Sequence, residues 1–173
     1  GSFTLAAQSS SDTTDLGIRW DNNDGGRTVG EVKARGFFRV GDDKGPVMTI
    51  AILPSGVTVN SAIWNISPAR IVIDSVSTFF DNILISSRTK YIGLGGRLSR
   101  KPEEKVTLSF EGLNMSYLNN LLNREQDTRE ESVQMKFEGL ISGDLTLSDV
   151  YDNLLFESKI NVTDFRLNDN NYG

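Results

Sequence analysis

Ser87 and Lys90 have the spacing of an S-x-x-K motif, in which a desolvated lysine activates a serine nucleophile. The two side chains of that motif meet across a turn of helix, whereas this segment is polar and lies between two strand-like runs. The favoured interpretation of Ser87–Lys90 is therefore a hairpin turn. The chain has no histidine and no cysteine. This excludes Ser-His and Cys-His nucleophile systems and removes the commonest metal ligand.

Two further segments have part of a ligand-binding pattern. Gly93–Gly96 has the glycines of a phosphate-cradling loop, but no helix N-terminus follows it. Asp21–Gly26 begins like a calcium loop, yet Gly25 stands at the fifth ligand position and Val32 stands where the closing glutamate belongs. These patterns predict a glycine-rich bend within a strand and a hairpin turn, respectively.

Two pairs of carboxylates are the remaining candidates for acid–base chemistry. Glu103-Glu104 and Glu130-Glu131 lie in hydrophilic loops, where nothing would raise the pKa of one carboxylate above that of the other. We interpret both pairs as solvated surface. The sequence therefore predicts a protein that is not an enzyme, with no catalytic, cofactor-binding or metal-binding residues.

The composition of the chain excludes several classes of protein. The 173 residues carry 18 basic and 23 acidic side chains, a net charge of −5, and no basic stripe with interleaved aromatic residues. Nucleic acid is therefore not an expected partner. With 38% apolar residues, 16 glycines and 4 prolines, the composition is typical of a folded domain. No segment approaches the roughly 20 apolar residues of a transmembrane helix.

The elements that would position any site are strands. In Ala62–Asp74, apolar and polar residues alternate on both sides of a break at Ser67-Pro68, and a period of two places alternate side chains on opposite faces of a sheet. The same alternation recurs in residues 2–8, 16–20, 28–40, 48–52, 82–86, 91–98, 106–110, 133–137, 141–147 and 156–167. An all-β fold with one extended, apolar-faced sheet is predicted. Gly36 suggests a bulge or a bend.

One short helix and two weak repeats complete the predicted organisation. Asn114–Arg124 is the helical candidate, with Asn114 or Ser116 as its cap. Gly96–Ser99 matches Gly143–Thr146, and the strand containing Leu108 matches the one containing Ile160. We expect residues 1–173 to be a single β-rich segment of a longer repetitive protein, with repeats at about 91–122 and 133–167. Chance similarity between alternating strands is the other interpretation.

The apolar face is the candidate functional surface. Two interpretations stay open from the pattern alone: the core of a closed sandwich or barrel, and an exposed lining. The residues assigned to this face are Trp64, Ile71, Ile73, Ile85, Leu108, Phe110, Met135, Phe137, Leu145, Ile160 and Val162.

In their order along the chain, several segments resemble the C-terminal region of the TamB family of Gram-negative envelope proteins, which is related to the AsmA-like lipid-transfer group. The resemblance covers nearly the whole chain. The segments that carry it are Trp20–Asn22, Gly30–Val32, Leu53–Asn60, Ile63–Pro68, Ile71–Asp74, Tyr91–Ser99, Leu113–Asn119, Gly143–Ser148 and Val162–Leu167.

The resemblance implies a sheet folded into a half-pipe, or β-taco, with an apolar groove. It also implies a periplasmic location in a protein anchored to the inner membrane outside this segment. The implied partners are phospholipid or other acyl chains and an Omp85-type, TamA-like outer-membrane barrel. The expected function is a non-enzymatic scaffold that conducts lipid between membranes or assists outer-membrane protein assembly. The alternative is a closed β-sandwich binding or adhesion module. Self-association through open edge strands is a further expectation.

Overall fold

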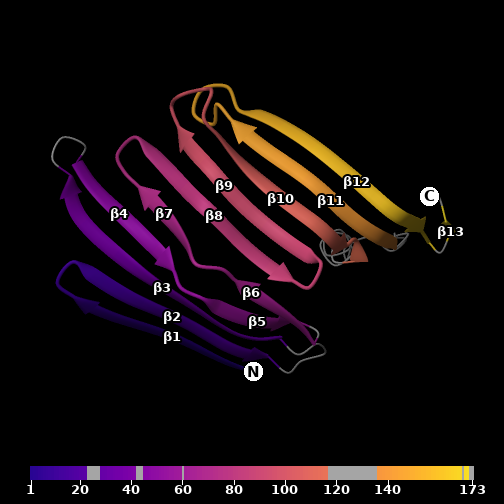
Figure 1. Ribbon diagram of the computed structural model, residues 1–173, viewed down its shortest axis with the longest axis horizontal. Coiled ribbons are helices and arrows are strands. Elements are labelled where there is room, and N and C mark those ends of the chain that lie inside the picture. Colours follow the sequence, from indigo (N-terminus) through magenta and orange to yellow (C-terminus); the bar gives the residue numbers. More distant parts are fainter. Residues whose placement is uncertain (23–27, 42–44, 60, 117–135, 169, 172–173) are drawn as a thin grey trace, which may run out of the picture.

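The computed structural model describes residues 1–22, 28–41, 45–59, 61–116, 136–168 and 170–171. Its strands form one antiparallel sheet of thirteen (Figure 1), which confirms the predicted all-β fold. None of the described residues belongs to a helix with the length and hydropathy to cross a membrane. The strands are β1 (Ser2–Ser10), β2 (Thr13–Asn22), β3 (Thr28–Gly41), β4 (Gly45–Ile52), β5 (Ser55–Val59), β6 (Ala62–Ile66), β7 (Ala69–Ile73), β8 (Ser77–Ser87), β9 (Lys90–Ser99), β10 (Lys105–Asn114), β11 (Phe137–Ser148), β12 (Leu155–Leu167) and β13 (Asn170–Asn171).

The centre of the sheet is a long hairpin. Its first arm consists of β4 and β5, its second arm consists of β6 and β7, and each arm is interrupted at a proline. β4 and β5 both pair with β3, and β6 and β7 both pair with β8. Proline has no N–H to donate to a ladder, and the interruptions fall at Leu53-Pro54 and at the predicted break Ser67-Pro68. The preceding residues keep the sheet continuous: Leu53 N donates to Lys33 O and Ser67 N donates to Leu84 O, both at 2.9 Å.

Of the bulge or bend predicted at Gly36, the bulge is wrong, because β3 pairs without a register shift through that residue. The shifts lie elsewhere in the sheet. Asp81 and Asn82 of β8 oppose the single residue Gly95, and Glu111 and Gly112 of β10 oppose Ser142. A third shift lies where β12 passes Gly139 of β11. Asn82, Gly112 and Asp164 have φ of 44°, 61° and 55°, the left-handed conformation typical of bulges, which bend and twist the bulged strand.

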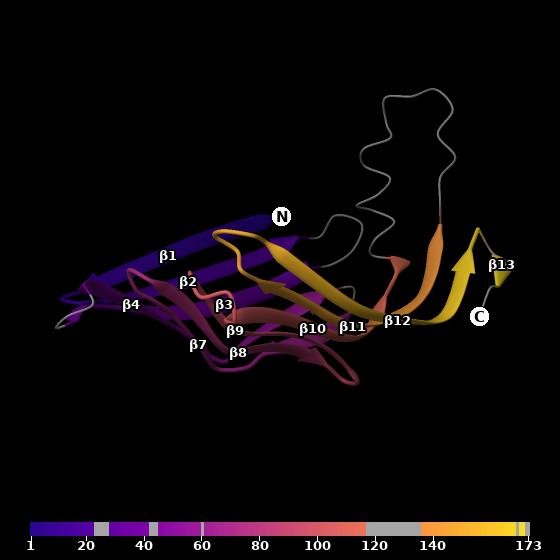
Figure 2. The ribbon, with the colours of Figure 1, turned by 90° about the horizontal axis from the view of Figure 1, so that it is seen from above.

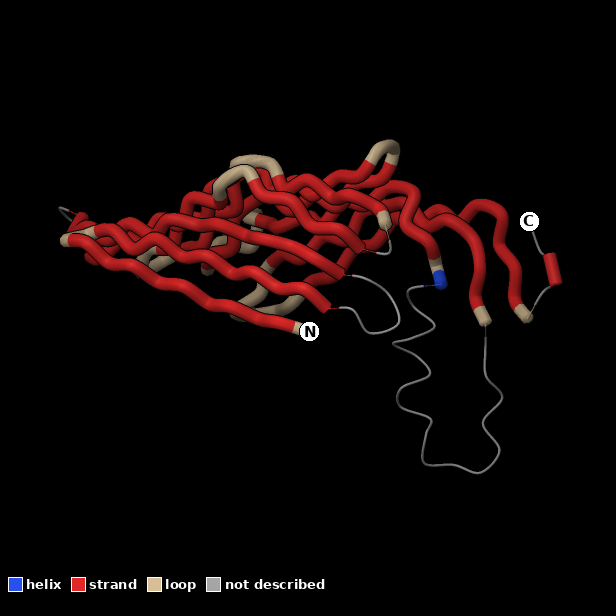
Figure 3. The backbone as a smooth tube through the Cα atoms, turned by 90° about the horizontal axis from the view of Figure 1, so that it is seen from below, coloured by secondary structure: helices blue, strands red, loops and turns tan. Residues whose placement is uncertain are grey.

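The sheet is curved as well as twisted. Figure 2 shows β1 and the first part of β12 on the same side of the central strands β7 and β8. Figure 3 shows the same strands from the opposite side. Every pair of strands with extensive contact is a pair of hydrogen-bonded neighbours. The described strands therefore form one bent layer, in which distant strands do not pack face to face.

The helix predicted at 114–124 falls mostly outside the described residues. At its start, Asn114 Oδ1 accepts a hydrogen bond of 2.8 Å from Ser116 N, which is the kind of contact that a capping asparagine makes. The division into two repeats also stays a prediction. Gly96 of β9 and Gly143 of β11 nevertheless have matching surroundings, because each lies against the backbone of a lysine on the next strand, Lys105 and Lys159.

Candidate functional site

One face of the sheet carries almost no charge from β1 to β12, and we call it the uncharged face. Directly opposed residues share a face, so the pairing of the strands defines it. The odd-numbered residues of 3–9, 55–59, 69–73 and 137–147 lie on this face. So do the even-numbered residues of 14–20, 28–40, 46–52, 62–66, 92–98, 106–110 and 156–162. Residues 78, 80, 83, 85 and 113 complete it. In the described strands, two charged residues adjoin this face: Lys90 at the first position of β9, and Asp164 of β12, which follows Val162 at the bulge opposite Gly139.

The residues expected to line a groove share this face. Leu108 lies directly opposite Leu145, and one row across the strands joins Ile85, Ile92, Phe110, Gly143 and Ile160. The predicted lining also includes residues in other rows of the same face: Trp64, Ile71, Ile73, Phe137 and Val162. Met135 lies outside the described residues. The others share one face, as a groove lining requires, and their role as a lining stays a prediction.

Exposure on the uncharged face rises from the centre of the sheet to its edges. Trp64 and Phe110 are only 9% and 7% exposed. By contrast, Phe3 on β1 is 70% exposed, and Phe156 and Ile160 on β12 are 60% and 52% exposed. In a single layer, side chains bury one another only where they converge. Side chains on the uncharged face therefore bury one another at the centre of the sheet. At its edges the same face presents large apolar groups to solvent.

The opposite face carries the ion pairs of the strands. Arg35 Nε lies 2.5 Å from Asp15 Oδ1, Arg19 Nη2 lies 3.1 Å from Glu31 Oε1, and Arg70 Nη2 lies 2.9 Å from Asp81 Oδ2. Hydrogen bonding from Arg35 lowers the pKa of Asp15 below its usual value. These pairs are exposed and contribute little stability each. Their position marks the opposite face as the charged face of the sheet.

Glycines allow close packing on the uncharged face, in one place beneath an aromatic ring and in two places against the backbone of the next strand. Trp20 of β2 lies over Gly30 of β3, where an added Cβ would come within 2.6 Å of the indole ring. At Gly96 and Gly143, an added Cβ would overlap the carbonyl oxygen of Lys105 or Lys159. Only glycine fits at such close approaches.

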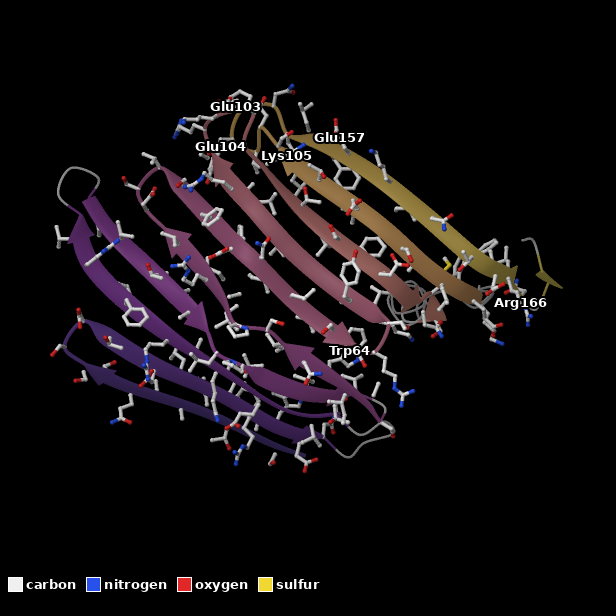
Figure 4. All side chains as sticks on the ribbon, in the orientation of Figure 1. Trp64, Glu103, Glu104, Lys105, Glu157 and Arg166 are labelled. Atoms are coloured by element: carbon white, nitrogen blue, oxygen red, sulfur yellow. The ribbon has the colours of Figure 1, made fainter. Side chains whose placement is uncertain are left out.

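A hollow also lies at one end of the strands. It measures about 800 Å³ and lies among the turns between β7 and β8, between β9 and β10, and between β11 and β12. Figure 4 labels Glu103, Glu104 and Lys105 at this end of the sheet and Trp64 at the other. Arg97 lines the hollow, with its Nη1 donating to Ser77 Oγ at 2.9 Å and its Cζ 4.8 Å from the centroid of the Phe79 ring.

Asp74 closes the turn beneath this hollow. Its Oδ1 accepts hydrogen bonds from Val76 N at 2.8 Å and from Ser77 N at 2.7 Å. The bond from Val76 is the largest cause that lowers the pKa of Asp74 below its usual 3.8, and the bonds from Ser77 add to it.

The ionised form of Asp74 therefore stabilises the fold above its unfolded pKa, and this contribution is lost as the pH falls through the lower folded pKa. We expect Asp74→Asn to lower the free energy of unfolding by roughly 1 kcal/mol at neutral pH. The difference from the wild type should vanish in strong acid. Denaturant unfolding as a function of pH measures it, and a difference that persists unchanged to the lowest pH would contradict this assignment.

The structure places the chemical motifs of the sequence in turns and strands. Ser87 and Lys90 are paired residues on either side of the two-residue turn between β8 and β9, which confirms the hairpin, and no hydrogen bond joins their side chains. Gly93–Gly96 lies within β9. Asp21 is the penultimate residue of β2, and residues 23–27, which follow that strand, lie outside the described part. Glu130-Glu131 also lies outside it. Within the described part, acidic side chains do not gather in threes as a metal site requires.

Sequence reasoning omitted several residues of the same face. Phe80, Leu94, Val106, Leu147 and Phe156 lie beside the predicted lining residues in the rows across the sheet. The signal for them was present, because each continues the alternation of its own strand.

The chain was compared with protein-family models, with curated proteins and with solved structures, and none of these comparisons gave a match. The site therefore has to be interpreted from its own chemistry.

Proposed function

We propose that the uncharged face is the wall of a half-pipe that holds the acyl chains of lipids, and that the chain is a non-enzymatic segment of a periplasmic scaffold along which phospholipid moves between membranes. The observation that carries this proposal is the continuity of the face. Its charged positions in the described strands are at its margins, Lys90 at a turn and Asp164 at the β12 bulge, while the ion pairs of the strands lie on the other face.

The size of the exposed apolar surface supports binding rather than a simple core. A soluble monomer seldom exposes an apolar patch beyond a few hundred Å² without a partner for it. Here Phe3, Leu5, Phe38, Phe156 and Ile160 are all more than half exposed on one face. On the opposite face, the exposed Phe37 lies between Arg35 and Arg39 of the same strand. The uncharged face is thus an extended surface that needs a covering molecule.

The energetics of lipid favour such a surface. Burial from water contributes about 0.8 kcal/mol for each CH₂, so an acyl chain of about 14 methylenes gains roughly 11 kcal/mol. A lipid that leaves a bilayer needs a comparable environment at each point of its path. A face with alternating aliphatic and aromatic side chains provides this, whereas each inward charge would add several kcal/mol. Assistance to outer-membrane protein assembly would use the same apolar surface.

The proposal is tested by equilibrium binding of a phosphatidylethanolamine that carries a fluorophore on one acyl chain. We expect saturable binding that unlabelled phospholipid displaces and that the deacylated head group, glycerophosphoethanolamine, does not. Displacement by the head group alone would show that the contact is polar and would contradict the proposal.

A closed binding or adhesion module is the second candidate function. It predicts that no acyl chain binds and that a dye for exposed apolar surface stays dark. The exposed side chains on β1 and β12 favour the first candidate.

A further inference from the structure

We propose that two copies of this chain associate edge to edge through β12, with antiparallel pairing about a two-fold axis at Ser158. Among the described residues, β12 is the last long strand of the sheet, and the pairs on its outer side are those of Arg166 and Leu167 with β13. Every residue of the remaining stretch, Leu155–Asp164, is exposed. A strand edge of this kind offers its backbone N–H and C=O groups to another strand.

The charges of β12 select both the partner and the register. Glu157 and Lys159 lie on the charged face of the sheet, one on each side of Ser158. When two β12 strands pair with Ser158 opposite Ser158, Glu157 of each copy faces Lys159 of the other. Opposite charges directly across a strand pair stabilise it, and like charges destabilise it. Registers centred one residue to either side place glutamate opposite glutamate or lysine opposite lysine.

The same register also pairs apolar side chains on the uncharged face of the two copies. It places Phe156 of one copy opposite Ile160 of the other, and both residues are more than half exposed in the single chain. A two-fold axis perpendicular to the sheet keeps equivalent faces on the same side. The uncharged faces of the two copies then join into one surface, and the two most exposed large side chains of β12 on that face cover each other.

The other open edge lacks these features. β1 is also exposed along its length, but its residues carry no charge, so no charge pair selects one register over another there. Pairing of β1 with β12 would leave Glu157 and Lys159 opposite uncharged residues, and such a head-to-tail contact would not close. Self-complementary β12 edges give a closed dimer.

Charge reversal tests the proposal with matched variants. In analytical ultracentrifugation over a concentration series, the wild type should form dimers. Glu157→Lys and Lys159→Glu should each weaken the dimer about tenfold or more, because each creates two like-charge pairs. An equimolar mixture of the two variants should form heterodimers, and the double variant E157K/K159E should associate like the wild type. Both residues are exposed, and circular dichroism verifies that each variant is folded.

A cysteine trap gives a second readout that also detects weak association. The chain has no cysteine, so Ser158→Cys introduces one thiol at the axis, and mild oxidation should link two copies. Thr163→Cys, on the same strand but far from its own counterpart in this register, should link them much less. Undiminished association of either single charge variant, a mixture without heterodimers, a wild type that stays monomeric, or equal linking at both cysteines would overturn the proposal.

Discussion

Leu108→Arg should lower the affinity for the acyl-labelled phospholipid at least tenfold while the protein stays folded. Leu108 lies in the middle of the uncharged face, directly between Leu94 and Leu145 of the neighbouring strands. An arginine there places a charge where the acyl chain lies, at a cost of several kcal/mol, and about 1.4 kcal/mol corresponds to one factor of ten in the dissociation constant. The fluorescence titration described above measures the effect.

The matched control for this variant is Ser109→Arg, one residue along the same strand. Ser109 faces the other way and donates a hydrogen bond of 2.6 Å to Asp144 Oδ1, so an arginine there points into a charged environment. Its binding should equal that of the wild type. Val162→Arg is an independent variant at an exposed position on the uncharged face, which removes the concern that Leu108→Arg merely unfolds the chain. Binding that survives in both folded arginine variants would contradict an acyl-binding face.

Gly96→Val should be the most destabilising single substitution on β9, with a loss of about 3 kcal/mol or more in the free energy of unfolding. Gly96 has a φ of 119°, a conformation that costs a residue with a side chain about 1–3 kcal/mol. The added Cβ would also overlap the Lys105 carbonyl oxygen on β10, and backbone cannot move aside as a flexible side chain can.

Gly93→Ala in the same strand is the control. A Cβ at Gly93 would lie 3.9 Å from the nearest atoms, which is ordinary contact, so its free energy of unfolding should change by less than about 1 kcal/mol. Chemical denaturation of the two variants beside the wild type gives both values. Equal stabilities for Gly96→Val and Gly93→Ala would show that the strands do not approach each other as described.

The faces of the strands could be predicted from the sequence because they follow from a local rule. The period of two placed Val32, Ala34, Phe38 and Val40 on one face, and the pairing of β2, β3 and β4 agrees. The predicted break at Ser67-Pro68 is likewise a local property, since proline cannot donate to the ladder.

The bends of the sheet could not be predicted in the same way. Gly36 and Gly96 both interrupt an apolar alternation, yet Gly36 pairs regularly and Gly96 adopts a positive φ. What distinguishes them is the approach of a neighbouring strand, which depends on contacts between strands and not on the glycine itself. The bulge at Asn82 is a similar case, because its partner Gly95 lies across a hairpin.

The choice between a closed core and an open face was also beyond the sequence. Alternation at Phe110 and Ile160 is the same whether a second sheet covers them or not. In the structure Phe110 is buried by its neighbours and Ile160 is half exposed, a difference that comes from their places at the centre and at the edge of one curved layer.

Photo-crosslinking from two aromatic positions tests the central claim most directly. A benzophenone amino acid replaces Phe110 in one variant and Tyr91 in the other, and each is irradiated with phospholipid vesicles. Residue 110 faces the uncharged side and residue 91, which pairs with Glu111, faces the charged side. We predict lipid adducts from position 110 and almost none from position 91. Equal labelling at the two positions, or labelling from position 91 alone, would contradict an acyl-binding uncharged face.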